Sequence, residues 1–173
     1  MPQPGATCNL DGLYLADREQ EIQYDITVRH DSAGCNSQQL FKGILDNKAR
    51  AYFNGAIYVS PGAQKTEAYQ ANHNLLLTRE AKITTKPQLE IYADDVKCSH
   101  GATIGRLDEL GLFYLRSRGI SLAEAQMLQQ MAFVQDVLDR VHTQPIRSRL
   151  EKMVESRLRG EFTRCSHCTM HCC

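Results

Sequence analysis

The first hundred residues carry short segments in which apolar and polar side chains alternate. Ile22, Tyr24, Ile26 and Val28 are apolar or aromatic, and the residues between them are polar. A period of two is typical of a strand that buries one face. Similar short segments lie at 13–16, 40–45, 51–59, 75–77, 89–93 and 96–98, separated by turn-forming residues. We therefore predict a first half made of many short strands.

Two all-β architectures fit these strands, a sandwich and a solenoid of stacked coils. The glycines and asparagines at the predicted strand ends suit the tight corners of a solenoid. No strict repeat is visible in the sequence, so the pattern alone leaves both architectures open.

The second half has the period of helices instead. We predict helices over 107–118 and 121–142, and a third from Pro145 to a closing Gly160. Ser121 and Glu124 have the spacing of a capping box. The middle segment carries one apolar stripe, made of Met127, Met131, Val134, Leu138 and Val141. A unit of about fifty residues buries only a modest core, so we expect some of this apolar surface to face the β-part or a second protein.

Composition narrows the classes of function. The chain has 173 residues, 42% of them hydrophobic, and its formal net charge is zero. A net charge of zero is unlike the strongly basic charge of a typical nucleic-acid-binding protein. No apolar run approaches the roughly 20 residues that span a membrane. The first five residues have no features of a secretory signal, so we interpret the seven cysteines as reduced thiols. We expect a cytoplasmic protein, or a plastid protein if the source is a plant or alga.

Candidate metal chemistry lies at the seam between the two halves. In a strand, Cys98 and His100 point to the same face, which places a thiol beside an imidazole. The alternative is a buried thiol near an ordinary surface histidine. Spacing alone leaves both interpretations open.

The C-terminal tail is a second candidate. It carries four cysteines and two histidines, namely Cys165, His167, Cys168, His171, Cys172 and Cys173. Such a tract can bind zinc or another soft metal. A structural zinc site usually folds chain on both sides of itself, so we favour a disordered tail with adventitious metal affinity.

Three phrases, taken in order, resemble one known family. They are residues 62–77, with Gly-Ala-Gln-Lys-Thr and Tyr-Gln-Ala-Asn; residues 86–103, with Lys-Cys-Ser-His-Gly-Ala-Thr; and residues 112–120, Leu-Phe-Tyr-Leu-Arg-Ser-Arg-Gly-Ile. Together they resemble the C-terminal part of the SufB/SufD family of iron–sulfur cluster assembly proteins. The third phrase is similar to the SufD members. The resemblance covers roughly residues 38–157.

The resemblance implies a mainly β fold with an α appendage. It implies a right-handed parallel β-helix over residues 1–104 and a C-terminal helical domain over 105–160. Residues 161–173 remain as a tail outside the family pattern. It also implies a heterodimer with a SufB-like protein, paired near the end of the β-helix, and docking of a SufC-like ATPase on the helical domain. Without a SufB-like partner, a homodimer is the alternative assembly.

The resemblance also implies roles for particular residues. His100 is expected to be an iron or cluster ligand at the partner interface, with Cys98 beside it. The docking surface for the ATPase is expected to include Leu112, Phe113, Tyr114, Met127 and Met131. No catalytic residue is expected. Iron or a nascent iron–sulfur cluster is expected in the assembled complex, with no cofactor held tightly by the chain alone.

The chain departs from the family because the long region preceding the β-helix is absent, which suggests a truncated protein or a fragment. Rival hypotheses are a small metal-binding protein acting through its tail, a non-catalytic β-solenoid interaction module, and a β-solenoid enzyme acting on carbohydrate. The last needs paired carboxylates. Asp94 and Asp95 are adjacent, and in a strand they would point to opposite faces.

Overall fold

The structure is a computed structural model that describes residues 1–161. The chain divides into two compact units, one ending at Arg106 and one beginning at Leu107. The first unit holds all the strands of the described chain and the second holds its helices.

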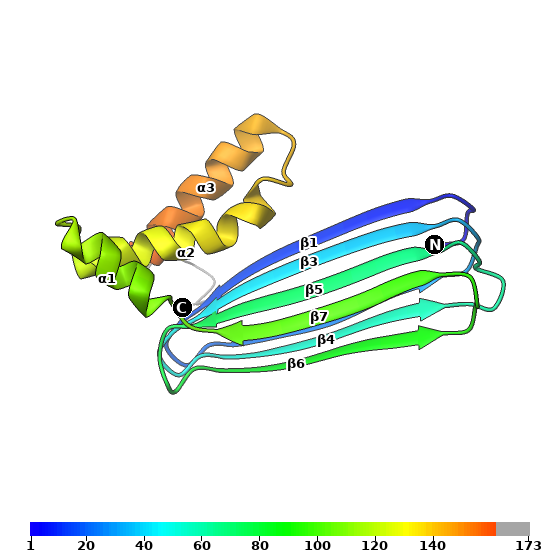
Figure 1. The fold of residues 1–173 in the computed structure, drawn as a ribbon, viewed down its shortest axis with the longest axis horizontal. Coiled ribbons are helices and arrows are strands. Elements are labelled where there is room, and N and C mark those ends of the chain that lie inside the picture. Colours follow the sequence, from blue (N-terminus) through cyan, green and yellow to red (C-terminus); the bar gives the residue numbers. More distant parts are fainter. Residues whose placement is uncertain (162–173) are drawn as a thin grey trace, which may run out of the picture. The chain divides into compact units, whose positions relative to one another are not determined.

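Seven strands of almost equal length form the first unit (Figure 1). They are β1 (Thr7–Ala16), β2 (Glu21–His30), β3 (Asn36–Leu45), β4 (Arg50–Val59), β5 (Glu67–Leu76), β6 (Lys82–Ile91) and β7 (Lys97–Gly105). All pairings are parallel, in the orders β1-β3-β5-β7 and β2-β4-β6. Consecutive strands therefore alternate between two sheets, and the chain winds as a parallel β-solenoid of about three turns. This confirms the predicted solenoid and rules out the antiparallel sandwich.

The length of each turn explains why no strict repeat is visible in the sequence. In the sheet that contains β7, Thr7 pairs with Asn36, Asn36 with Glu67, and Glu67 with Lys97. The corresponding offsets are 29, 31 and 30 residues. The corners absorb these differences while the strands stay in register.

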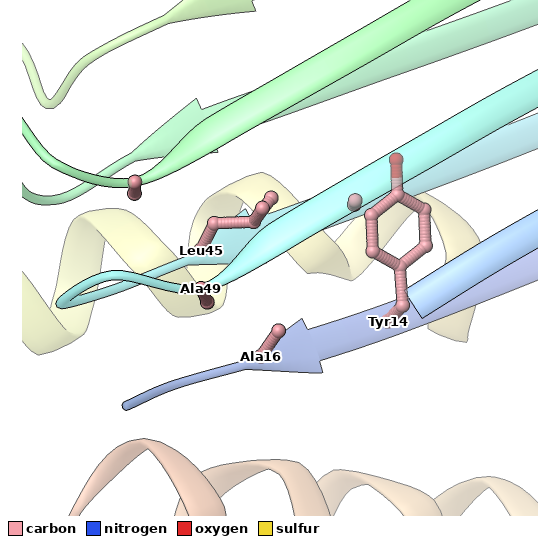
Figure 2. Close-up of a cluster of buried hydrophobic side chains, with 6 residues drawn as sticks. Tyr14, Ala16, Leu45 and Ala49 are labelled. Atoms are coloured by element: carbon pink, nitrogen blue, oxygen red, sulfur yellow. The ribbon is translucent and has the colours of Figure 1, made fainter. Parts of the chain in front are cut away.

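Every second side chain of a strand points into the solenoid, where two apolar clusters form. One cluster contains Tyr14, Ala16, Leu45, Ala49, Ala51 and Ala81. Figure 2 shows four of these side chains labelled, with the Tyr14 ring standing up from β1 and its hydroxyl at the far end. The other cluster contains Ile57, Val59, Ala63, Ala68 and Ala93. Small residues at the corners let successive turns stack closely.

The interior also contains a buried polar network around Tyr14. Its hydroxyl donates a hydrogen bond to Asn74 Oδ1 and accepts one from Asn72 Nδ2 at 3.2 Å. Asn74 Nδ2 donates in turn to Asn72 Oδ1 at 2.8 Å. Burial raises the pKa of Tyr14 from 10.0 to about 12, although the bond from Asn72 acts in the opposite direction. These bonds allow the polar groups to be buried without the full cost of desolvation.

Glycine inside a strand makes room for this network. A Cβ atom added at Gly43 would lie 2.1 Å from Cε2 of Tyr14 and 2.5 Å from Oδ1 of Asn74. The glycine is therefore required by close packing rather than by a turn. Such interior glycines weaken the sequence signal of a strand, because glycine is uncommon in strand interiors.

The observed strands are longer than the predicted ones at several places. β1 begins at Thr7 instead of residue 13, and β6 begins at Lys82 and runs through Pro87. Proline is tolerated there because β6 is the last strand of its sheet. The prediction of a strand starting only after Pro87 was therefore wrong.

The second unit contains α1 (Glu109–Ser117), α2 (Leu122–Leu138) and α3 (Gln144–Leu158). Ser121 Oγ accepts a hydrogen bond from the Glu124 amide at 3.2 Å, as its predicted capping role requires. Gly119 and Gly160 have positive φ angles just after α1 and α3. However, α2 ends at Leu138 with Asp139 as its C-cap residue, rather than near residue 142.

Candidate functional site

The last turn of the described solenoid ends in two edge strands, β6 and β7. In the part of the chain that the structure describes, each pairs with one earlier strand, β4 or β5. The outer side of each strand therefore presents backbone groups that a further strand could pair with. Apart from the half-buried Cys98, residues on the inward face of β7 are exposed, because no later turn within residues 1–161 covers them.

Cys98 and His100, the two ligands predicted at the seam between the halves of the chain, both lie on β7. Cys98 pairs in register with Ala68, and His100 pairs with Gln70. Ala68 and Gln70 are buried in the interior, so Cys98 and His100 continue two inward-facing columns of side chains. His100 is exposed and Cys98 is half-buried. The two side chains therefore share one face at the open end of the solenoid.

The surroundings of Cys98 are mostly apolar. It packs against the cluster that includes Ile57, Ala68 and Ala93. Burial raises the pKa of the Cys98 thiol, and a backbone hydrogen bond with Ala68 opposes this effect only in part. The thiol therefore keeps its proton at neutral pH, whereas metal binding requires the thiolate. Cys98 alone is a weak ligand, and His100 is the more available of the two.

An amide pair lies behind His100 in the same column. Gln70 Nε2 donates to Gln39 Oε1 at 3.0 Å, and both residues are buried. Gln70 Oε1 and Gln39 Nε2 have no hydrogen-bond partner among the described residues. Sequence analysis missed both glutamines, because only the register of the turns brings residues 39, 70 and 100 into line.

A complete metal site is not present within the described part of the chain. Over residues 1–161, no three His, Cys, Asp or Glu side chains lie close enough to hold one metal ion together. Cys98 and His100 supply two donors of the kinds found around iron–sulfur clusters. Any further ligands must come from outside the described residues.

The predicted docking residues lie on two helices and differ in exposure. Phe113 and Tyr114 on α1 are 73% and 57% exposed, and Leu112 beside them is partly buried. On α2, Met127 is buried and Met131 is partly buried. Met127 is therefore not accessible on the surface of the described chain, and its predicted part in docking stays a prediction. Leu110, 80% exposed, extends the accessible apolar surface of α1 instead.

The predicted tail ligands, Cys165, His167, Cys168, His171, Cys172 and Cys173, lie outside the described residues. Among the described helices, none is long and apolar enough to cross a membrane.

The carboxylates considered for carbohydrate chemistry are placed differently from the prediction. Asp94 and Asp95 lie in the corner between β6 and β7, not in a strand, and Asp95 forms an ion pair with Lys65. A hollow of about 440 Å³ on the outer face of β2, β4 and β6 includes Asp25 in its lining. The Asp25 carboxylate accepts hydrogen bonds from Gln23 Nε2 at 2.6 Å and from Asn54 Nδ2 at 3.1 Å.

Comparison with known proteins gives a family match over most of the chain. The family described as "SUF system FeS cluster assembly, SufBD core domain" matches residues 1–133. The iron–sulfur cluster assembly protein SufD of Escherichia coli (strain K12) is 41% identical over 155 residues, which are 90% of this chain and 37% of that protein.

Two other relatives come from Synechocystis sp. and Arabidopsis thaliana. A SufBD family iron–sulfur cluster assembly protein of Synechocystis sp. is 44% identical over 144 residues, 83% of this chain and 31% of that protein. The chloroplastic protein ABCI7 of Arabidopsis thaliana is 35% identical over 156 residues, 90% of this chain and 33% of that protein. The chain thus spans about a third of the length of these relatives.

Proposed function

The chain belongs to the SufBD core family of the SUF iron–sulfur cluster assembly system, and from this premise we propose that it acts as a SufD-like scaffold component. In this role it does not turn over a substrate by itself. It supports iron acquisition and the assembly of a nascent cluster, which is the cargo of the complex. The complex is proposed to work in the cytoplasm, or in the plastid if the source is a plant or alga; the chloroplastic name of the Arabidopsis thaliana relative supports the second place.

The observation that carries the proposal is the open last turn of the solenoid with His100 exposed on it. The unpaired edges of β6 and β7 suit pairing with strands of a SufB-like protein. Cys98 and His100 would then be covered by the partner, whose side chains would complete the ligand set. A cluster held by ligands from two chains is easier to release than one held by four cysteines of one chain.

Iron content tests the role of His100 in the assembled complex. The chain is co-purified with a SufB-like and a SufC-like protein, and iron per complex is measured for wild type, His100→Ala and Cys98→Ala. We expect the complex to assemble in each case and its iron content to fall most in His100→Ala. His142→Ala, which removes an exposed histidine of the second unit, is the matched control. Equal iron in wild type and His100→Ala would remove the ligand role.

We further propose that the exposed apolar residues of α1 dock the SufC-like ATPase. Phe113 is 73% exposed and lies beside the exposed Tyr114, an arrangement common in binding surfaces. Phe113→Asp is expected to abolish the pull-down without changing the circular dichroism spectrum. Tyr52→Asp, which places the same charge on β4, should leave the pull-down intact. Normal binding by Phe113→Asp and by Leu110→Asp would exclude α1 as the docking site.

A further inference from the structure

The interior of the solenoid contains a side-chain acceptor without a partner among the described residues, on Gln70, whose backbone pairs in register with His100. Gln70 is 3% exposed, and its Oε1 has no hydrogen-bond partner in the described chain. A buried polar atom without a hydrogen-bond partner is unfavourable, because it has lost its bonds to water and gained none in the protein. Such a group in a folded protein calls for a partner that satisfies it in the working state.

The position of the Gln70 amide is fixed by its neighbours. Its Nε2 donates to Gln39 Oε1 at 3.0 Å, which leaves Oε1 as the free end. A Cβ atom at Gly55 would lie 2.6 Å from Gln70 Nε2 and 2.7 Å from Oε1, so the glycine on β4 makes the space that the amide fills. The amide has little freedom to turn away from this position.

His100 follows Gln70 in the same column, toward the open end of the solenoid. Gln70 and His100 are partners in the register of β5 and β7, with their side chains on the inward face. Neighbouring strands lie about 4.8 Å apart, a separation that an imidazole and a glutamine amide can bridge after a rotation of His100. His100 is exposed and can make that rotation.

We propose that Gln70 is a positioning residue for His100, and that its Oε1 accepts a hydrogen bond from the Nδ1–H of the imidazole. This inference rests on the proposed ligand role of His100. Nδ1 lies on the backbone side of the ring and can face the neighbouring strand. The bond fixes the proton on Nδ1 and leaves Nε2, the outer nitrogen, with its lone pair directed away from the interior. A histidine ligand is commonly oriented in this way by a carbonyl that accepts its other N–H.

The proposed hydrogen bond to His100 gives Gln70 a role that Gln39 does not share. Gln39 lies one turn deeper and reaches His100 only through Gln70. Replacement of Gln70 by methionine keeps the length of the side chain and removes the acceptor. Replacement of Gln39 by methionine makes a similar change in polarity and volume. It removes the acceptor of Gln70 Nε2 but keeps the Gln70 carbonyl, whose side chain is still confined by its close packing at Gly55. Gln39→Met is therefore the control for a loss of polarity inside the column without loss of this carbonyl.

The first measurement needs no metal. The full chain is labelled with ¹⁵N-histidine, and the His100 ring signals are assigned among its six histidines by their loss in His100→Ala. An unrestrained imidazole favours the proton on Nε2. We expect the Nδ1–H form in wild type and in Gln39→Met, and a return to the Nε2–H form in Gln70→Met. A dominant Nε2–H form in wild type overturns the proposal even if Gln70→Met does not fold. An unchanged His100 spectrum in folded Gln70→Met overturns it as well.

The second measurement is the affinity of the assembled complex for ferrous iron. Loss of a residue that orients a metal ligand costs about 10–100-fold in affinity, so we expect a loss of that size in Gln70→Met and wild-type affinity in Gln39→Met. The two proposals can fail separately. If the Nδ1–H form holds but His100→Ala retains normal iron, the ligand role is wrong and the hydrogen bond stands. If His100→Ala loses iron and Gln70→Met keeps wild-type affinity, the ligand role stands and the positioning role of Gln70 is wrong.

Discussion

Removal of the Tyr14 hydroxyl should destabilise the solenoid at neutral pH and do so less at alkaline pH. In Tyr14→Phe, Asn72 Nδ2 loses its acceptor and Asn74 Oδ1 loses a donor, and both asparagines are 1% exposed. Each buried group left without a partner costs about 1–3 kcal/mol. Because the two amides remain bonded to each other, we expect a loss of about 2–4 kcal/mol in the free energy of unfolding at pH 8.

The smaller effect of the substitution at alkaline pH follows from the pKa of Tyr14, which burial raises from 10.0 to about 12. The unfolded state loses the phenolic proton first, so the folded state binds more protons above pH 10 and wild-type stability falls as pH rises. A shift of two pKa units corresponds to about 2.7 kcal/mol once both states have lost the proton, and about 1.4 kcal/mol of this is lost by pH 11. Tyr14→Phe has no phenol at this position and escapes that loss.

Urea unfolding followed by circular dichroism between pH 8 and 11 measures both effects. The gap between wild type and Tyr14→Phe should be widest at pH 8 and narrower by about 1.4 kcal/mol at pH 11. Tyr52→Phe, which removes a hydroxyl from a side chain 38% exposed, is the control for a phenol in contact with water. A gap that stays constant with pH would refute the argument that burial of the Tyr14 phenol stabilises its protonated form.

Three further changes probe other parts of the structure. Gly43→Ala places a Cβ atom 2.1 Å from the Tyr14 ring and should lower stability by about 1–3 kcal/mol in urea unfolding, whereas Gly62→Ala, with no atom within 4 Å, should change it little. Burial lowers the pKa of His30 below its ordinary value of 6.5, so the free energy of unfolding should fall as pH drops below 6.5, where the unfolded state takes up the proton first. His30→Gln should therefore lose less stability than wild type between pH 7 and 5. Equal losses in the two proteins would contradict the burial effect on His30. Removal of residues after Gly160 should leave co-purification with both SUF partners intact, and its loss would support a function in the tail.

The sequence alone was sufficient to predict the general architecture. Alternating segments such as 22–29 predicted strands because one face of each strand is buried. Capping and terminating residues such as Ser121 and Gly119 predicted helix ends because backbone groups there need specific partners or positive φ angles. The family resemblance, carried by contiguous phrases, was confirmed by a match over residues 1–133.

The tertiary structure decided which distant residues meet. Tyr14, Asn72 and Asn74 look like exposed polar positions in the sequence, yet they satisfy one another inside stacked turns. Interior glycines such as Gly43 interrupt the strand pattern for the same reason, since large side chains of adjacent turns occupy their space. Local periodicity therefore underestimated the lengths of the strands.

The residues around the candidate site could likewise not be predicted from the local sequence. Spacing placed Cys98 and His100 on one face, because alternation within a strand is a local property. The amides of Gln39 and Gln70 reach the same column only through offsets of 31 and 30 residues. The corners set those offsets, and they vary from turn to turn without leaving a repeat in the sequence. Backbone pairing between successive turns, which is a property of the folded solenoid alone, brings Gln70 into register with His100; the side-chain carbonyl of Gln70 has no partner among the described residues.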